Sequence, residues 1–149
     1  MNKLICFDMD GTIADLYSVP HWLDKLMAED ESPYREAKPL VDMEALSQTL
    51  EALIFKGWEI CVISWASKGA SKAYKKKIRA AKLEWLAKYK FPGKAHIIQY
   101  GATKANAIRK YTDHAILFDD DAKVRKGWRL GRAIDPTKVD ILEELEKLI

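Results

Sequence analysis

Short apolar runs alternate with longer segments of helical spacing along the whole of this 149-residue chain. Strands that alternate with helices in this way predict a parallel sheet covered by helices on both faces. We therefore expect an α/β fold, a Rossmann-like doubly wound parallel sheet of about five strands, in a single domain over residues 1–149. The expected strands are KLICF at 3–7, WEICVI at 58–63, AHIIQ at 95–99, AILF at 115–118 and a short one at 132–134.

The segments between these strands place apolar residues three or four positions apart, as one face of a helix requires. Asp42 is a suitable N-cap for one of these helices, and Gly57 is a suitable stop. The expected helices cover about 20–29, 43–56, 70–90, 103–111 and 137–149. The longest is basic, and its apolar stripe consists of Tyr74, Ile78, Ala81, Trp85 and Tyr89.

The composition excludes several classes of protein. Hydrophobic residues make up 48% of the chain and charged residues 32%, which is typical of a globular protein and not of a disordered one. The N-terminus reaches acidic residues too soon for a secretory signal, and no apolar run approaches the roughly 20 residues of a membrane span. We expect a cytoplasmic protein that binds no membrane and keeps Cys6 and Cys61 as buried, reduced thiols.

The charges are distributed unevenly along the chain. Residues 1–59 carry 5 basic and 12 acidic side chains, whereas residues 60–112 carry 13 basic side chains and a single acidic one, Glu84. A segment this basic predicts a surface that attracts anions. A plain solvated helix face is the alternative explanation.

Polar residues gather where the predicted strands end. In open α/β sheets the ligand lies beyond the carboxyl ends of the strands, so these residues are expected to converge. Carboxylates from two strands suit a hard cation such as Mg²⁺, which takes oxygen ligands and leaves room for a phosphate. Ser64 can donate to a phosphate oxygen and Lys104 can neutralise it. The converging set is Asp8, Asp10, Ser64, Lys104 and Asp119–Asp121.

Four segments of the chain resemble, in order, the motifs of the haloacid dehalogenase-like (HAD) superfamily of phosphohydrolases. They are DMDGT after the first strand, Ser64 at the end of WEICVIS, Lys104 at the start of a helix, and AILFDDD. The resemblance spans residues 3 to about 134. It implies that Asp8 is a nucleophile that forms an aspartyl-phosphate and that Asp10 is the general acid and base. It also implies that Ser64 and Lys104 hold the phosphoryl oxygens.

The same resemblance implies a Mg²⁺ site made by Asp8, the backbone carbonyl of Asp10, and two residues of the acidic triple. We favour Asp119 and Asp120 as that pair because they come first after the strand. Asp121 is then expected to cap the helix that follows. An acidic residue at position 10 is typical of the phosphatases and phosphotransferases of this superfamily, whereas its dehalogenases lack one.

The segment that selects the substrate in this superfamily is short here. Residues of about 15–41 would form a minimal helical cap, which leaves an open site. Trp65 directly follows Ser64 and is a candidate for stacking on a base, although it can equally be a core residue. Lys68 and Lys72 are expected near the phosphate. KLEWLAKY, at residues 82–89, resembles the matching helix of the 5′(3′)-deoxyribonucleotidases, which favours a nucleotide as substrate.

Three functions follow as hypotheses. The first is a Mg²⁺-dependent phosphomonoester hydrolase that acts on a nucleotide. The second is a phosphatase of polynucleotide 3′ or 5′ ends, and the third is an anion-binding module without catalysis. The second would follow a nucleic acid strand with the basic helix and with Lys123, Arg125, Lys126, Arg129 and Arg132.

Overall fold

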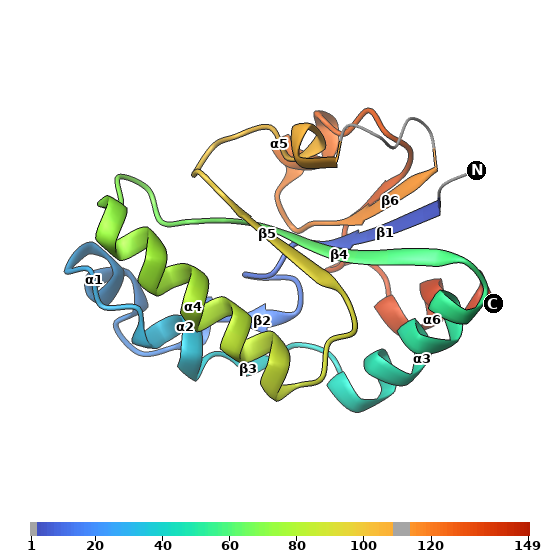
Figure 1. Cartoon of the computed structure of the whole chain (residues 1–149), viewed down its shortest axis with the longest axis horizontal. Coiled ribbons are helices and arrows are strands. Elements are labelled where there is room, and N and C mark those ends of the chain that lie inside the picture. Colours follow the sequence, from blue (N-terminus) through green and yellow to red (C-terminus); the bar gives the residue numbers. More distant parts are fainter. Residues whose placement is uncertain (1–2, 109–113) are drawn as a thin grey trace.

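Five parallel strands form the central sheet of the computed structural model, which describes residues 3–108 and 114–149. Their order in space is β5-β4-β1-β6-β7, so β1 lies in the middle (Figure 1). Phe7 of β1 is in register with Val62 of β4 and with Phe118 of β6. The predicted α/β fold is confirmed. The strands are β1 (Lys3–Phe7), β4 (Trp58–Trp65), β5 (Lys94–Ile98), β6 (Ala115–Phe118) and β7 (Ala133–Ile134).

Helices cover both faces of this sheet. On one face lie α3 (Met43–Phe55), α4 (Lys72–Lys88) and α6 (Ile141–Glu146), and on the other lie the 3₁₀ helix η2 (Lys104–Ile108) and α5 (Ala122–Lys126) (Figure 1). Successive side chains of a strand point to opposite faces. Accordingly, Ile5 and Phe7 belong to the core beneath α3 and α6, whereas Leu4 and Cys6 pack toward η2.

Side-chain caps fix where several helices begin. The Asp42 side chain accepts a hydrogen bond from Ala45 N at 3.1 Å, as its position before α3 predicted. Asp140 caps α6 in the same way. Because Asp140 fixes the start of α6, that helix is shorter than the 137–149 expected. Thr137 belongs to a turn in which its backbone N–H and its hydroxyl both donate to Asp135.

Most other boundaries agree with the prediction to within two residues, and two of the differences concern elements that carry predicted site residues. β4 runs on to Trp65, two residues beyond the expected strand. The helix expected over 103–111 is the 3₁₀ helix η2, and residues 109–111 lie outside the described residues.

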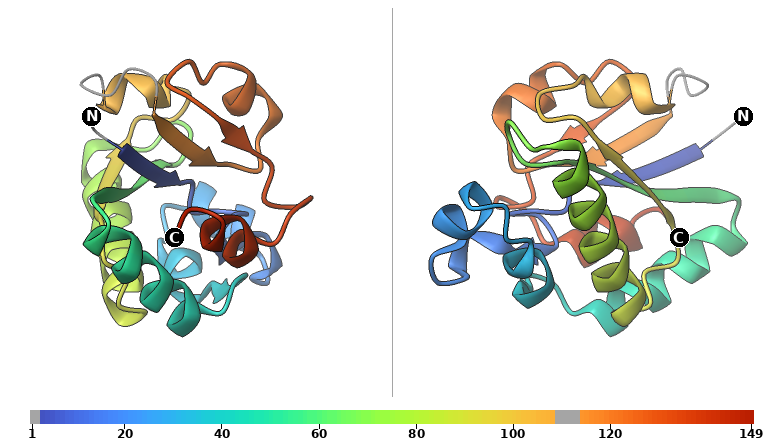
Figure 2. Two further views of the ribbon diagram at one scale, coloured as in Figure 1. Left: turned by 90° about the vertical axis from the view of Figure 1, so that its right-hand side faces the viewer. Right: turned by 60° about the vertical axis from the view of Figure 1, so that its left-hand side comes forward.

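Residues 14–39 form a small unit beside the carboxyl ends of the strands. Two short antiparallel strands, β2 (Ala14–Asp15) and β3 (Lys38–Pro39), close this unit at its base. Between them come η1 (Leu16–Ser18), α1 (Trp22–Met27) and α2 (Ser32–Glu36). Figure 2 shows α1 and α2 protruding from the body of the molecule. The unit is tied to α4, because Tyr74 donates a hydrogen bond to Asp30 O at 3.0 Å and Arg35 pairs with Glu84 at 2.8 Å.

Cys6 and Cys61 lie side by side on neighbouring strands. Both are buried free thiols, as predicted, and their sulfur atoms are 3.4 Å apart. Burial raises the pKa of Cys6 well above its usual value, and the neighbouring Cys61 thiol adds to the effect. Among the helices that the structure describes, none has the length and apolar character that crossing a lipid bilayer requires.

Candidate active site

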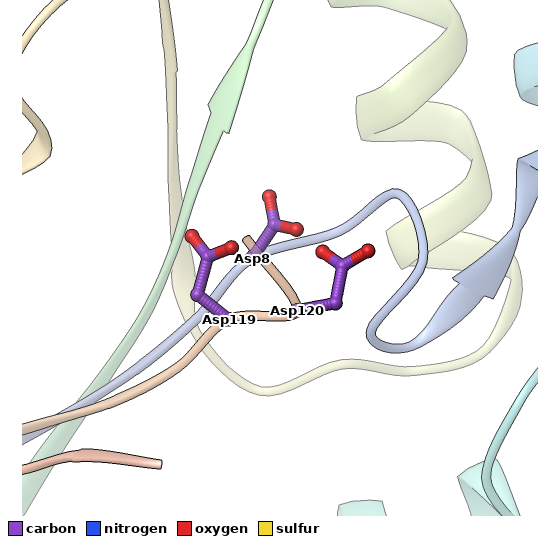
Figure 3. A group of neighbouring side chains, drawn as sticks. All are labelled: Asp8, Asp119 and Asp120. Atoms are coloured by element: carbon purple, nitrogen blue, oxygen red, sulfur yellow. The ribbon is translucent and has the colours of Figure 1, made fainter. Parts of the chain in front are cut away.

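Three carboxylates meet where β1 and β6 end. Asp8 directly follows β1, and Asp119 and Asp120 directly follow β6. Because these parallel strands are neighbours in register, their ends lie together, and Asp8 N donates to Phe118 O at 2.8 Å. Oxygens of the three carboxylates lie within 4.8 Å of one another. Figure 3 shows the three side chains extending in the same direction from the two chain segments.

Lys104 neutralises part of this acidic cluster. Its Nζ donates to Asp8 Oδ1 at 2.8 Å and to Asp119 Oδ2 at 2.7 Å. The three side chains are buried. Burial disfavours the charged form of Lys104, but its two carboxylate partners outweigh that effect and raise its pKa. One ammonium against three carboxylates leaves an excess of negative charge at the end of the sheet.

Burial, and after it this negative charge, raises the pKa values of the two carboxylates that follow β6. Burial and then the charge of Asp8 raise the pKa of Asp119 to about 6, against the opposing effect of Lys104. Burial and the nearby Asp8 carboxylate raise the pKa of Asp120 to about 8. An oxygen-only donor set with unbalanced negative charge suits a divalent cation such as Mg²⁺. The residues present therefore fit the metal that the sequence predicts.

Gly11 makes the close approach of the DMDGT turn to Asp120 possible. Its φ of +82° is a conformation that residues with a side chain rarely adopt. A Cβ at this position would collide with the Asp120 carboxylate and with the ring of Tyr17. In the same turn, the Thr12 hydroxyl donates to Asp8 Oδ2 at 3.3 Å.

The side chain of Asp121 is engaged by the start of α5. Its side chain accepts hydrogen bonds from Lys123 N at 2.8 Å and Val124 N at 3.3 Å and so caps α5. The prediction that the third residue of the triple is a helix cap is confirmed. Arg125 of α5 donates to Asp119 O at 3.0 Å, which ties the helix to the acidic turn.

A second cluster joins Asp10 and Ser64 through a residue that the sequence analysis missed. Lys82 of α4 is fully buried, and its Nζ lies 2.9 Å from Asp10 Oδ2 and 2.6 Å from Ser64 Oγ. Burial raises the pKa of Asp10, and the charge of Lys82 opposes that shift. Lys82 stands four residues after Ile78 and three before Trp85, on the apolar stripe. A lysine at a stripe position was the signal that could have revealed it.

A cavity of about 630 Å³ opens over the acidic cluster. Asp8, Asp10, Lys104, Asp119 and Asp120 line it, together with Trp65 and Lys68. Ser64 is buried and is not part of this lining. The rest of the wall is mostly aromatic and aliphatic. Its main members are Leu16, Tyr17, Trp22, Leu23, Leu26, Met27, Tyr34 and Tyr100.

Trp65 forms a wall of this cavity beside Lys104. Its indole Nε1 donates to Ala102 O at 2.9 Å, which fixes the plane of the ring. The Lys104 Nζ lies 5.3 Å from the ring centroid, and the Tyr100 ring lies 5.2 Å away. Trp65 is half-buried, so one part of its ring remains open to the cavity.

Lys72 lies outside this cavity, in a neighbouring basic groove of about 260 Å³. We call the side chains Lys72, Lys75, Lys76 and Arg79 on the outer face of α4 the basic groove. Its floor is the end of β5, and Ala66 borders both the groove and the larger cavity.

Three arginines after β6 have polar partners within the protein. Arg125 pairs with Asp135 at 3.4 Å, and Arg129 donates to Asn106 at 3.0 Å. Arg132 approaches Glu144 at 4.0 Å. These three guanidinium groups are therefore less free to follow a nucleic acid strand than their number in the sequence suggested.

Comparison with solved structures identifies a similar fold. No protein-family model matches the chain, and no curated protein matches it. A solved structure, the D,D-heptose 1,7-bisphosphate phosphatase from Burkholderia thailandensis, has a similar fold with a TM-score of 0.57. The match covers 99% of this chain and 98% of that one at 14% sequence identity. At this identity the likeness shows the fold alone.

Proposed function

We propose that the protein is a Mg²⁺-dependent phosphomonoester hydrolase of the HAD type. The observation that carries the proposal is the acidic cluster of Asp8, Asp119 and Asp120 in the lining of the 630 Å³ cavity, where Lys104 bridges Asp8 and Asp119. Hydrolysis of this kind needs a nucleophile, a cation and an acid within one site; Asp8 would be the nucleophile, the three carboxylates would hold the cation, and Asp10 would be the acid. The phosphatase with a similar fold adds support from an independent comparison.

In the first step, an oxygen of the Asp8 carboxylate attacks the phosphorus of the monoester. A bond forms between this oxygen and phosphorus as the bond between phosphorus and the ester oxygen breaks. Asp10 gives its proton to the ester oxygen, so that the leaving group departs as an alcohol. Lys104 brings positive charge close to where the phosphoryl oxygens would lie.

In the second step, water releases the phosphate from Asp8. The Asp10 carboxylate takes a proton from a water molecule as the water oxygen attacks phosphorus. The bond between phosphorus and the Asp8 oxygen breaks, and inorganic phosphate leaves. Asp8 is again a carboxylate and Asp10 again carries a proton, so the cycle closes.

Asp8, Asp119 and Asp120, with the backbone carbonyl of Asp10, would hold Mg²⁺. The metal supplies positive charge that lets an anionic nucleophile approach an anionic ester. Ser64 would donate to a phosphoryl oxygen from the end of β4.

A nucleotide is the substrate that the cavity wall favours. Residues of about 15–41 would act as a minimal cap, and they bring Tyr17 and Trp22 to the cavity that Trp65 also lines. Flat aromatic rings around a phosphate site suit a planar base better than a bare sugar. Lys68 also lines the cavity and would add positive charge for an anionic substrate.

A phosphate-terminated nucleic acid strand is the second candidate substrate. It is favoured by one observation, the basic groove that meets the cavity at Ala66. A strand with its end in the cavity could continue along Lys72, Lys75, Lys76 and Arg79. Each contact with a backbone phosphate would make binding more sensitive to salt.

A phosphate-release assay tests the proposed function. We expect the purified protein to hydrolyse p-nitrophenyl phosphate with Mg²⁺ and to stop when the metal is chelated. After a rapid acid quench, a peptide that contains Asp8 should carry one phosphoryl group. The Asp24→Asn variant, which changes an exposed carboxylate of α1, is the matched control and should keep full activity. A protein that binds phosphate but releases none would be the anion-binding module instead.

A panel of phosphates then separates the substrate classes. Nucleoside monophosphates, sugar phosphates and oligonucleotides with a terminal phosphate are compared at low and moderate salt. A mononucleotidase should prefer the first class with little salt dependence. A preference for oligonucleotides that is lost at moderate salt would support the strand-end phosphatase. A preference for sugar phosphates would contradict both the mononucleotide and the strand end as substrates.

A further inference from the structure

Lys82 is a lysine buried beneath the proposed active site with every proton of its ammonium in use. Its Nζ donates to Asp10 Oδ2 at 2.9 Å, to Ser64 Oγ at 2.6 Å and to Trp65 O at 2.8 Å. The ring of Tyr34, from the small unit over the sheet, lies 4.6 Å from the same atom. The side chain is fully buried, and its three donor hydrogens all go to protein oxygens, so none is left for a substrate.

Stability alone is a poor reason for this arrangement. Moving an ammonium out of water costs several kcal/mol, and buried ion pairs are often no more stabilising than apolar side chains of the same size. Lys82 also stands on the apolar stripe of α4, between Ile78 and Trp85, where a leucine or methionine would pack without that cost. The groups that the Lys82 ammonium contacts therefore explain its presence better than protein stability does.

We propose that Lys82 is a positioning residue that orients the Asp10 carboxylate for protonation of the leaving group; this inference rests on the proposed function. Lys82 binds Oδ2 of Asp10, which leaves Oδ1 as the oxygen that can face the ester. The Asp10 side chain is 16% exposed and lines the cavity, so one edge of its carboxylate is open.

The contact between Lys82 and Ser64 limits where the Ser64 hydroxyl can point. Because Lys82 donates to Ser64 Oγ, that oxygen acts as an acceptor, and its own proton must point elsewhere. The hydroxyl thereby stays a donor for another oxygen. The third contact holds the Trp65 carbonyl and hence the end of β4 that carries Trp65 toward the cavity. One ammonium thus connects α4 with the DMDGT turn and with the end of β4.

The test replaces Lys82 by methionine and compares two leaving groups. p-Nitrophenolate departs without a proton, whereas an alkyl alcohol needs the proton of Asp10. We measure kcat/KM, which covers the steps up to leaving-group departure. Lys82→Met should lower kcat/KM for an alkyl phosphomonoester on the order of 100-fold, the usual size of general-acid catalysis, and that for p-nitrophenyl phosphate by much less. Lys88→Met, the same change at an exposed position of α4, is the matched control and should alter neither.

The ratio of the two kcat/KM values does not depend on how much of the sample is folded. It therefore remains informative if Lys82→Met lowers the yield, and Lys82→Gln offers a second variant that keeps a hydrogen-bond donor. In an Asp10→Asn background, Lys82→Met should cost little more with the alkyl ester, because the group that it positions is already gone.

Equal losses for both esters, or an undiminished loss in the Asp10→Asn background, would overturn the proposal and make Lys82 a structural residue. A wild-type protein that hydrolyses neither ester with Mg²⁺ would instead contradict the proposed function. The two failures are thus distinguishable.

Discussion

The Nζ of Lys104 lies 2.8 Å from Oδ1 of Asp8, although 96 residues separate the two in sequence. The same ammonium lies 2.7 Å from Asp119 Oδ2. The contact joins the end of β1 to the start of η2 across the edge of the sheet. It fixes the orientation of the proposed nucleophile, whose second oxygen accepts a hydrogen bond from Thr12.

Lys104→Ala is expected to lower turnover and to weaken phosphate affinity. The charge that faces the phosphoryl oxygens is lost, and a loss on the order of ten- to a thousand-fold is typical for one such electrostatic contact. Steady-state kinetics and inhibition by inorganic phosphate measure the two effects. Lys138→Ala, at an exposed position, is the control. Unchanged kinetics would shift the phosphate-binding role to Lys68.

Asp8→Asn is expected to abolish turnover while the fold is kept. The amide has the same volume, but it cannot attack phosphorus. The change also removes one charge from the crowded acidic cluster, so the variant should melt at a higher temperature than the wild type when both are free of metal. Circular dichroism and a phosphate-release assay check both effects. More than a trace of activity in the pure variant would refute the role of Asp8.

The strands, most helices and the acidic cluster could be predicted because each depends on local pattern. An apolar run followed by Asp8 or by Asp119 shows where a strand ends, and parallel strands bring such ends together. Lys82 could not be predicted in the same way. Its place depends on the rotation of α4 relative to β4, and lysines nearby in the sequence, such as Lys75, do project into solvent. Lys72 was likewise predicted near the phosphate because it follows Ser64 closely in the sequence. The helix instead directs its side chain into the basic groove.

Asp120→Ala is expected to weaken Mg²⁺ binding more than Asp121→Ala does. Asp120 lies within the group of three carboxylates, whereas the side chain of Asp121 is occupied by the N–H groups of α5. Calorimetric titration with Mg²⁺ measures the affinities. Asp121→Ala should instead lower thermal stability, by about 1 kcal/mol for a lost helix cap. If Asp121→Ala is the more damaging change for the metal, the assignment of the pair is wrong.

The metal-free protein should lose stability as pH rises from about 5 to about 8. Asp119 and Asp120 have pKa values raised to about 6 and about 8, so the folded state binds more protons than the unfolded state in this range. Stability therefore falls as these protons leave and the carboxylates repel one another. Added Mg²⁺ should raise the melting temperature more at pH 8 than at pH 5. Melting curves with chelator and with Mg²⁺ measure both trends, and Asp120→Asn should flatten the first.

Trp65→Ala is expected to raise KM for a nucleotide by a factor that corresponds to about 1–3 kcal/mol, the usual contribution of one stacked base. The ring is held by the hydrogen bond from Nε1 to Ala102 O and lies at the cavity wall beside Tyr100. The ring also lies near the Lys104 ammonium, so removing it has a second way to lower activity, by displacing Lys104. The two routes differ in their dependence on substrate. A lost stacking partner affects only substrates with a base, whereas a displaced Lys104 slows every phosphate ester.

The comparison therefore uses one nucleoside monophosphate and one small alkyl phosphate on the same variant. Trp58→Ala is the matched control, because Trp58 is also half-buried but stands at the opposite end of β4. We expect a higher nucleotide KM for Trp65→Ala alone, with nearly unchanged kinetics on the alkyl ester. If both substrates slow by the same factor, Trp65 supports Lys104 and the core, and the nucleotide loses its best structural support. The sugar phosphates of the substrate panel would then become the leading candidates.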